Sequence, residues 1–396
     1  MRWILNMQHI EEKDFALISK IIKNISRSKR QQQCSVMQHA LPDVVGVKLT
    51  NRCNLRCKHC YEWNEQGYHH NMDKTLQNTD IDIEILKKVI NETKDTQPIF
   101  YLWGGEPLVY KNIDELLNLL ADNNRYTIIC TNSIMLPRYY NTLYKFDSKI
   151  ELLIALDGDE RSNDALRGNG NFLKTMKVIS DLIHMKNCGT FNGKISVHTM
   201  ISNENIDTLY EFVKTLDNTG IDNLILCFPW YISLDTSKEM DIYFNENFAP
   251  LKKNIDRIPS WYAYKYRIKK ENIELVKQIT QEIRRMDTKM NIQFQPDISN
   301  KELEMFLNGE AIYNCDNRDC FTIFSRMDIL PNGKVTSCKH FQELTYGDLK
   351  EDSVESVWNS NTANYIREII KEKQMPVCSK CNNLYRHSYK VIQNQG

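Results

Sequence analysis

Three cysteines lie close together near the start of the chain, at Cys53, Cys57 and Cys60. Their C-x3-C-x2-C spacing lets one loop bring three thiolates to one site, and thiolates select zinc or iron–sulfur clusters. Iron–sulfur clusters normally take four protein thiolates. A loop of three therefore leaves one iron free to bind a small molecule. The alternative is a zinc site that takes its fourth ligand from elsewhere in the chain.

Composition excludes several classes of protein. The 396 residues include 51 Lys+Arg and 51 Asp+Glu, so the net charge is zero and nothing attracts the whole chain to nucleic acid or anionic lipid. No apolar run is long enough to span a bilayer, and the polar N-terminus is not a signal peptide. Twelve cysteines without a signal peptide indicate metal chemistry in a reducing compartment. We expect a cytoplasmic protein without nucleic-acid or membrane partners.

The middle of the chain alternates apolar β-rich runs with helical periodicity. Strand–helix alternation implies parallel strands joined by right-handed crossovers. Six such units predict an α/β fold, an open (β/α)6 partial TIM-like barrel. The expected strands are 44–49, 99–103, 127–130, 150–155, 194–199 and 224–228, and the expected helices are 83–93, 112–122, 171–185 and 205–217. Asn112 and Asn203 are expected to cap two of these helices.

Four segments describe the expected organisation of the chain. Residues 1–43 form a helical extension with an amphipathic stretch at 11–26. The barrel occupies 44–232, and a mostly helical bridge with a helix at 271–287 and a strand at 291–295 occupies 233–310 and completes the core. A cysteine-rich module follows at 311–396, with a helix at 361–372.

Unusual residues stand directly after the first four expected strands. The cysteine loop follows the first, Gly104-Gly-Glu-Pro107 the second, Thr131-Asn-Ser133 the third and Asp157-Gly158 the fourth. Asn163-Asp164 and Arg167-Gly168 come next along the chain. Ligands of such folds gather at the carboxyl ends of the strands. We therefore expect these motifs to meet at one site.

The motifs in this order resemble the radical S-adenosylmethionine (SAM) superfamily, in its SPASM/twitch branch, over roughly residues 44–385. The resemblance implies that Cys53, Cys57 and Cys60 hold a [4Fe–4S] cluster whose free iron chelates the amino and carboxylate groups of SAM. It places His59 near adenine, Glu106 at the SAM ammonium and Arg167 at the SAM carboxylate. The full set of SAM-binding residues that it implies is His59, Gly104, Gly105, Glu106, Asn132, Asp157 and Arg167.

A second cysteine set consists of Cys320, Cys338, Cys378 and Cys381. A hairpin turn at 331–334 brings the first two toward each other. Four thiolates complete the ligand set of one [4Fe–4S] cluster, and a zinc ribbon needs the same four. The resemblance favours an auxiliary [4Fe–4S] cluster. No cysteine follows Cys381, so we expect a twitch/SPASM-like module with one cluster.

Two further cysteines are candidate hydrogen-atom donors. Cys227 ends the sixth expected strand, where its side chain faces either the reaction chamber or the core. Cys315 lies just before the second set and is a donor, a substitute cluster ligand or a thiol without a role. Cys130 lies in an apolar strand and is expected in the core.

The resemblance implies a radical SAM enzyme. With an electron from a reductant such as flavodoxin or ferredoxin, it would cleave SAM to a 5′-deoxyadenosyl radical that abstracts hydrogen from a substrate. The leading hypothesis is an oxidative cross-link or related modification of a ribosomal peptide or protein side chain. The alternative is oxidation of a small polyol or aminosugar. A catalytically silent zinc or iron scaffold is a third hypothesis. The substrate, the bond formed and the hydrogen abstracted are not indicated by the sequence.

Overall fold

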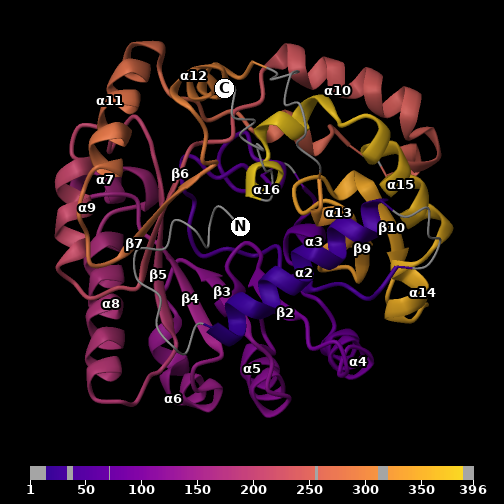
Figure 1. Ribbon diagram of the computed structural model, residues 1–396, viewed down its shortest axis with the longest axis horizontal. Coiled ribbons are helices and arrows are strands. Elements are labelled where there is room, and N and C mark those ends of the chain that lie inside the picture. The colour runs from indigo at the N-terminus through magenta and orange to yellow at the C-terminus, as the bar shows by residue number, and fades with distance from the viewer. Residues whose placement is uncertain (1–14, 34–38, 71, 255–256, 311–319, 387–396) are drawn as a thin grey trace, which may run out of the picture.

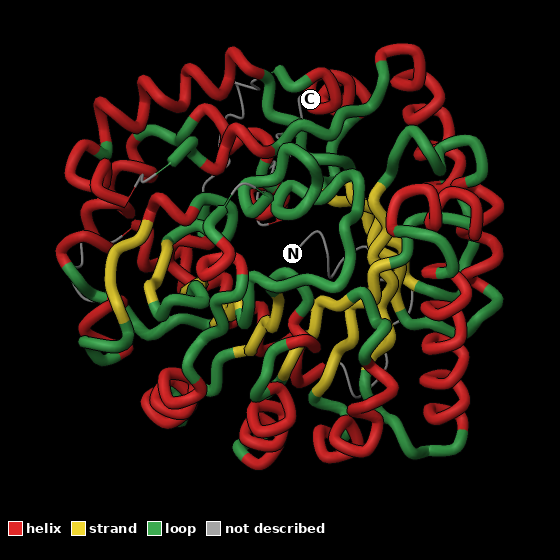
Figure 2. The backbone as a smooth tube through the Cα atoms, turned by 180° about the vertical axis from the view of Figure 1, so that it is seen from behind, coloured by secondary structure: helices red, strands yellow, loops and turns green. Residues whose placement is uncertain are grey.

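The computed structural model describes residues 15–33, 39–70, 72–254, 257–310 and 320–386. One curved sheet forms the inner layer, and helices cover its outer face (Figures 1 and 2). The sheet has ten strands in the order β10-β9-β8-β1-β2-β3-β4-β5-β6-β7. The strands are β1 (Val44–Lys48), β2 (Ile99–Trp103), β3 (Thr127–Thr131), β4 (Ile150–Ala155), β5 (Lys194–Met200), β6 (Asn223–Cys227), β7 (Asn291–Gln295), β8 (Arg326–Ile329), β9 (Lys334–Thr336) and β10 (Thr345–Asp348).

The strands from β1 to β7 pair in chain order, and every pair is parallel. The predicted α/β partial barrel is therefore confirmed. The segment expected at 291–295 forms β7 and pairs with β6, starting from Asn223 opposite Asn291. The bridge thus supplies a seventh parallel strand beyond the six predicted for the barrel.

The C-terminal module continues the same sheet. Strand β8 lies parallel to β1, from Val44 opposite Arg326 to Val47 opposite Ile329. Strands β9 and β10 then pair antiparallel. The predicted turn at 331–334 joins β8 to β9, and Gly333 has a φ of 84°, which glycine adopts without strain. The module is thus joined to the barrel by strand pairing rather than by a linker.

Most of the longer helices lie outside the sheet and present apolar faces to it. Helix α4, for example, buries Ile85, Leu86, Val89 and Ile90. The longer helices are α2 (Phe15–Gln33), α4 (Ile83–Glu92), α5 (Ile113–Asp122), α7 (Glu160–Arg167), α8 (Asn171–Asn187), α9 (Leu209–Asp217), α10 (Leu234–Asn247), α11 (Ile273–Arg284), α12 (Asn300–Asn308) and α15 (Asn361–Glu372). Shorter ones are α3 (Lys74–Gln77), α6 (Tyr140–Leu143), α13 (Thr322–Ser325), α14 (Val354–Trp358) and α16 (Asn382–Arg386). No helix among the described residues is both long and apolar enough to cross a bilayer.

Of the two predicted helix caps, the position of Asn112 is confirmed and the cap at Asn203 is wrong. Asn112 occupies the N-cap position of α5, but its side chain makes no capping hydrogen bond. Helix α9 begins after Thr208, later than predicted. Asn203 instead accepts from the backbone N–H of Lys269 at 2.8 Å and donates to the carbonyl of Arg267 at 3.0 Å. Its side chain therefore holds a distant loop and not a helix end.

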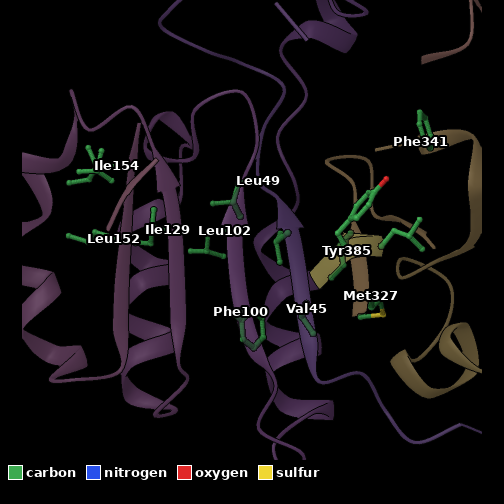
Figure 3. Packing of buried hydrophobic residues seen from close by; sticks show 14 of the residues in the cluster. Val45, Leu49, Phe100, Leu102, Ile129, Leu152, Ile154, Met327, Phe341 and Tyr385 are labelled. Atoms are coloured by element: carbon green, nitrogen blue, oxygen red, sulfur yellow. The ribbon is translucent and has the colours of Figure 1, made fainter. Parts of the chain in front are cut away.

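One hydrophobic core runs through barrel and module. Val45, Phe100, Leu102, Ile129 and Leu152 come from neighbouring strands and are fully buried (Figure 3). The same cluster continues through residues of the module, Met327, Phe341 and Tyr385. Because these residues alternate along each strand, the side chains between them face the inside of the barrel.

Candidate active site

The inside of the barrel contains a cavity of about 510 Å³, a volume typical of ligand sites. The loops after β1 to β4 meet there, as the motifs predicted. All but one of the residues expected around SAM line the cavity: Cys53, Cys57, His59, Cys60, Gly104, Gly105, Glu106, Asn132 and Arg167. Asp157 lies beneath them and is fully buried. At the opposite end of the strands, Ile21 and Ile25 of α2 close the cavity beside Val44 and Ile99.

The three cysteines of the first set share one environment. Burial raises the pKa of Cys53, Cys57 and Cys60, the last to about 12, and their negative charges oppose one another. Hydrogen bonds from backbone N–H groups lower the pKa of these thiols. Leu55 donates to Cys53 Sγ at 3.4 Å, and Glu62 and Trp63 donate to Cys60. Arg167 Nη1 lies 3.8 Å from Cys57 Sγ.

Three crowded thiols need a strong positive charge before they ionise together, and a cluster supplies it. Amide donors aimed at the sulfurs are the usual surroundings of iron–sulfur ligands. Across the described ranges, no three or more His, Cys, Asp or Glu side chains are arranged around one metal ion. The fit to a cluster therefore rests on the donor set: three thiols, their amide donors and one guanidinium.

Gly104 and Gly105 seat the cysteine loop. The N–H of Gly105 donates to the carbonyl of Thr50 at 3.0 Å, and that of Glu106 to Arg52 at 2.8 Å. A Cβ on Gly105 would lie 2.2 Å from the Arg52 oxygen. The sequence predicted close approach of these glycines to a ligand. In the structure they line the cavity, but their closest neighbour is the backbone before Cys53.

The Glu106 carboxylate joins the loops after β2 and β3. It accepts from Thr131 Oγ1 at 2.6 Å, from the N–H of Asn132 at 2.8 Å and from the N–H of Leu108 at 3.0 Å. Burial raises the pKa of Glu106, and these donors oppose the rise. The Asn132 side chain in turn donates to Asn54 in the cysteine loop at 2.7 Å. Both residues thus hold neighbouring loops in place at the cavity wall.

Asp157 holds two of the expected SAM-binding residues, Arg167 and His59. Its Oδ2 accepts from Arg167 at 2.7 Å and lies 3.4 Å from His59 Nε2. Burial alone would raise the pKa of Asp157, but Arg167, His59 and the N–H of Met200 outweigh it, so the carboxylate stays charged. The His59 ring meets Tyr266 edge-on at 6.1 Å. Asp157 therefore orients Arg167 and His59 from behind the cavity wall.

A buried ion pair that was not predicted from the sequence holds the cysteine loop. Lys48 ends β1 at 2% exposure, and its Nζ lies 2.7 Å from Glu62, two residues after Cys60. The same ammonium lies 2.8 Å from Tyr68 Oη and 2.8 Å from His69 Nε2. The available signal was a lysine inside an apolar strand, because buried lysines are almost always paired.

The second cysteine set also comes together. Burial, and the charge of neighbouring cysteines of the set, raise the pKa of Cys338 and Cys378, and that of Cys381 to about 12. Cys320 is among the neighbours whose charge raises the pKa of each of these three cysteines. Backbone N–H groups of His340 and Phe341 donate to Cys338. The four thiols therefore fit the auxiliary cluster expected from the sequence. Cys315 lies outside the described residues.

Residues next to the second set reach the cavity. Phe321, Lys339 and Asn382, each adjacent in sequence to one of these cysteines, line the cavity that the first set also lines. One cavity therefore extends from the first cysteine set to the immediate neighbours of the second.

Cys227 faces this cavity and not the outer core. Its Sγ lies 2.9 Å from His198 Nε2, and both residues line the cavity. Burial raises the pKa of Cys227, so the thiol keeps its proton, and burial lowers that of His198 to about 4. The role of Cys227 as a hydrogen-atom donor stays a prediction.

Cys130 also lines the cavity, so its assignment to the core was wrong. Its place in the alternation along β3 turns its side chain inward.

Two family models match the chain. The Radical SAM superfamily model matches residues 47–216, and the SPASM iron–sulfur cluster-binding domain model matches residues 320–382. Among curated proteins, Fe-coproporphyrin III synthase of Methanosarcina barkeri is 26% identical over 47% of this chain and 43% of its own length. The subtilosin biosynthesis protein AlbA of Bacillus subtilis is 30% identical over 34% of this chain and 30% of its own length. The chain thus spans less than half the length of these two relatives.

The fold is similar to that of a solved structure over most of the chain. Streptococcus suis SuiB bound to S-adenosylmethionine superimposes with a TM-score of 0.57 at 15% identity, covering 90% of this chain and 73% of that one. The match extends over barrel, bridge and module, in agreement with the continuous sheet.

Proposed function

We propose that this chain, which carries a radical SAM domain and a C-terminal SPASM domain, is a radical SAM enzyme that modifies a side chain of a ribosomal peptide or protein. Its cofactors are SAM and [4Fe–4S] clusters. The observation that carries the proposal is the single cavity, which the three cysteines of the first set line directly and which neighbours of the second set also line. A substrate in that space is close to both cysteine sets.

We assign the SAM-binding cluster to Cys53, Cys57 and Cys60, and the auxiliary cluster to Cys320, Cys338, Cys378 and Cys381. When bound, cluster and SAM supply a carbon-centred radical that removes a hydrogen atom from an unactivated carbon.

The chain's own residues prepare the site for that chemistry. Arg167, held by Asp157, offers a guanidinium to the carboxylate of SAM. Glu106 and the backbone beside it would face the SAM ammonium, and His59 would lie against the adenine. The apolar barrel walls and the residues of the module that line the cavity exclude water and other hydrogen donors.

Similarity to peptide-modifying proteins supports a peptide substrate. SuiB has been solved with its precursor peptide SuiA and shares its fold with this chain. AlbA acts in the biosynthesis of the bacteriocin subtilosin. Fe-coproporphyrin III synthase takes a different kind of substrate, so the radical chemistry and the substrate class need separate tests.

The radical chemistry is tested by the triple variant Cys53→Ala/Cys57→Ala/Cys60→Ala. After anaerobic reconstitution and reduction, the wild-type protein should form 5′-deoxyadenosine from SAM and the variant should form none, while the iron bound by the second set remains. The matched control is Cys188→Ala, because Cys188 is exposed. Formation of 5′-deoxyadenosine by the triple variant would refute the cysteine assignment.

The substrate class is tested by stimulation of the same reaction. Short peptides encoded beside the gene, a panel of polyols and aminosugars, and coproporphyrins are added separately to wild-type enzyme. A peptide substrate should raise 5′-deoxyadenosine formation. Its own mass should change by the amount that the modification adds or removes. Stimulation by a sugar or a porphyrin and by no peptide would overturn the peptide proposal and leave the radical chemistry intact.

A further inference from the structure

Lys339 brings an uncompensated positive charge to the cavity. It directly follows Cys338, is largely shielded from solvent and lines the cavity. Its Nζ lies 4.7 Å from the centre of the Tyr101 ring and 4.9 Å from that of Trp103. Among the residues that the structure describes, no carboxylate forms an ion pair with it. A cation over two aromatic faces keeps part of its stabilisation but has no carboxylate partner among these residues.

Three other cations in or beside the cavity are paired with carboxylates. Arg167 is paired with the buried Asp157, and Arg326 with the buried Asp328 at 2.7 Å. Lys48, whose Nζ lies 5.4 Å from the centre of the Trp103 ring, is paired with Glu62. Within the described part of the chain, Lys265 is a second cavity-lining ammonium without an ion-pair partner; it lies 5.6 Å from the Tyr262 ring. Among the described residues, Lys339 and Lys265 thus line the cavity without an ion-pair partner.

We propose that Lys339 binds the carboxylate of an acidic residue in the peptide substrate, and that Lys265 adds to the preference for negative charge. The inference rests on the proposed peptide function and specifies the substrate of the same cavity. A carboxylate is the matching group because a cation held away from water gains most from a charged acceptor at hydrogen-bond distance. A single ammonium suits a single negative charge.

The position of Lys339 gives this contact a consequence for the reaction. Lys339 is adjacent in sequence to Cys338, and its aromatic partner Trp103 directly precedes Gly104 and Gly105, which seat the first cysteine loop. An acidic residue bound there would hold the neighbouring substrate residue in the space between the two cysteine sets. Lys339 is thus a residue that determines where on a peptide the reaction occurs.

The experiment measures which peptides the reconstituted holoenzyme retains. A mass-encoded library of random synthetic peptides is incubated anaerobically with wild-type enzyme and SAM, and the ratio of Asp and Glu to Asn and Gln in retained peptides is compared with the input. We expect acidic residues to be enriched about tenfold, the effect of one charge-assisted hydrogen bond. Lys339→Met should remove most of this enrichment, and Lys339→Glu should enrich Lys and Arg instead.

Matched controls are Lys334→Met and Lys334→Glu, because Lys334 lies on the same hairpin and is exposed. These variants should retain the same peptides as wild type. Iron content of each variant shows whether the second cysteine set is loaded. A second measurement needs no enzyme variant. The retained peptides are resynthesised with Gln in place of Glu and Asn in place of Asp. We expect these amide versions to bind the wild-type enzyme about tenfold more weakly than the original peptides.

The outcomes separate this inference from the function on which it rests. Peptides retained without acidic enrichment, or with equal affinity for the amide versions, would overturn the role of Lys339 and leave peptide modification standing. If no peptide is retained by any form of the enzyme, both the peptide substrate and the role of Lys339 are overturned.

Discussion

A few buried charges decide where the first cysteine loop lies. Lys48 and Glu62 form an ion pair whose two side chains are 2% and 4% exposed. Such a pair contributes little net free energy over an apolar pair, but removal of one partner leaves the other charge buried alone. The pair therefore fixes the position of the segment after Cys60 rather than adding to overall stability.

We predict that Lys48→Met lowers the free energy of unfolding by about 3–5 kcal/mol, because Glu62 then lies buried without its cation. The double variant Lys48→Met/Glu62→Gln should recover much of that loss. Urea unfolding followed by circular dichroism measures both. Lys87→Met is the control, since Lys87 makes exposed ion pairs and should change little. Equal destabilisation by the single and double variants would contradict the prediction.

For single residues, the sequence predicted functional side chains that belong to one motif. It did not predict side chains that are far apart in sequence and meet only in the folded protein. Cys53, Cys57 and Cys60 were recognisable from spacing, and Arg167 from its place after Asp157. The 13 residues between Lys48 and Glu62 carry no periodic signal, and pairing across them depends on how the loop folds back. Lys339 was visible as a residue, but its lack of a counterion depends on the distances of all acids around it.

At the scale of elements, each of the two cysteine sets is held against the barrel by one segment. The Gly104-Gly105 turn after β2 supports the first cysteine loop. The 3-10 turn Pro376–Lys380 supports the second set. There Lys380 is fully buried and its Nζ donates to the carbonyls of Met305, Phe306 and Glu310 at 3.3, 3.2 and 2.6 Å. This ammonium joins the end of α12 to the loop that carries Cys378 and Cys381.

We predict that Gly105→Ala reduces SAM cleavage and the iron bound by the first set. The new Cβ would meet backbone atoms of Asn51 and Arg52 at 2.6 and 2.2 Å, and a backbone carbonyl cannot rotate away as a side chain can. Gly189→Ala is the control: its φ of 71° also disfavours alanine, but nothing lies within 4 Å. If both variants lose 5′-deoxyadenosine formation equally, general destabilisation rather than displacement of the loop is the cause.

We predict that Lys380→Met loosens the second set selectively. Carbonyls that lose a buried donor cost about 1–3 kcal/mol each, and that cost falls on the junction between α12 and the cysteine turn. Iron analysis should show loss of the iron bound by the second set, and hydrogen exchange should rise at 300–310 and 376–386. Lys371→Met is the matched control on α15, because Lys371 has a single weak ion pair at 3.9 Å. Full iron content in Lys380→Met would contradict this role.

For the whole molecule, the important feature is that barrel and module share one sheet and one core. The alternation of strand and helix between 44 and 228 was sufficient to predict the parallel strands, and their bounds differ by one residue or less from those observed. The pairing of β8 with β1 was not predictable in this way. Those strands are far apart in sequence, and a four-residue segment such as Arg326–Ile329, in which two residues are charged, does not specify its neighbour. Helix starts were also poorly predicted where Asn side chains bond to distant loops.

The continuous sheet makes the module part of the reaction chamber, and the last prediction tests what its cysteines do there. In Cys378→Ala/Cys381→Ala we expect about four irons per chain, against about eight in wild type, since each [4Fe–4S] cluster contains four. SAM cleavage should persist, because it needs only the first set. Modification of a stimulating peptide should fall further than 5′-deoxyadenosine formation does, because the substrate radical would lose its electron acceptor.

Loss of a metal site also weakens the segment that holds it, so this comparison requires soluble, folded variant with its first set fully loaded. Cys188→Ala again serves as the control for loss of a thiol. The ratio of modified peptide to 5′-deoxyadenosine is then the deciding measurement. An unchanged ratio would show that the second cluster stabilises the sheet beside β1 and takes no part in electron transfer. A lower ratio with normal SAM cleavage would show that the module acts in the reaction itself, across the cavity that both cysteine sets approach.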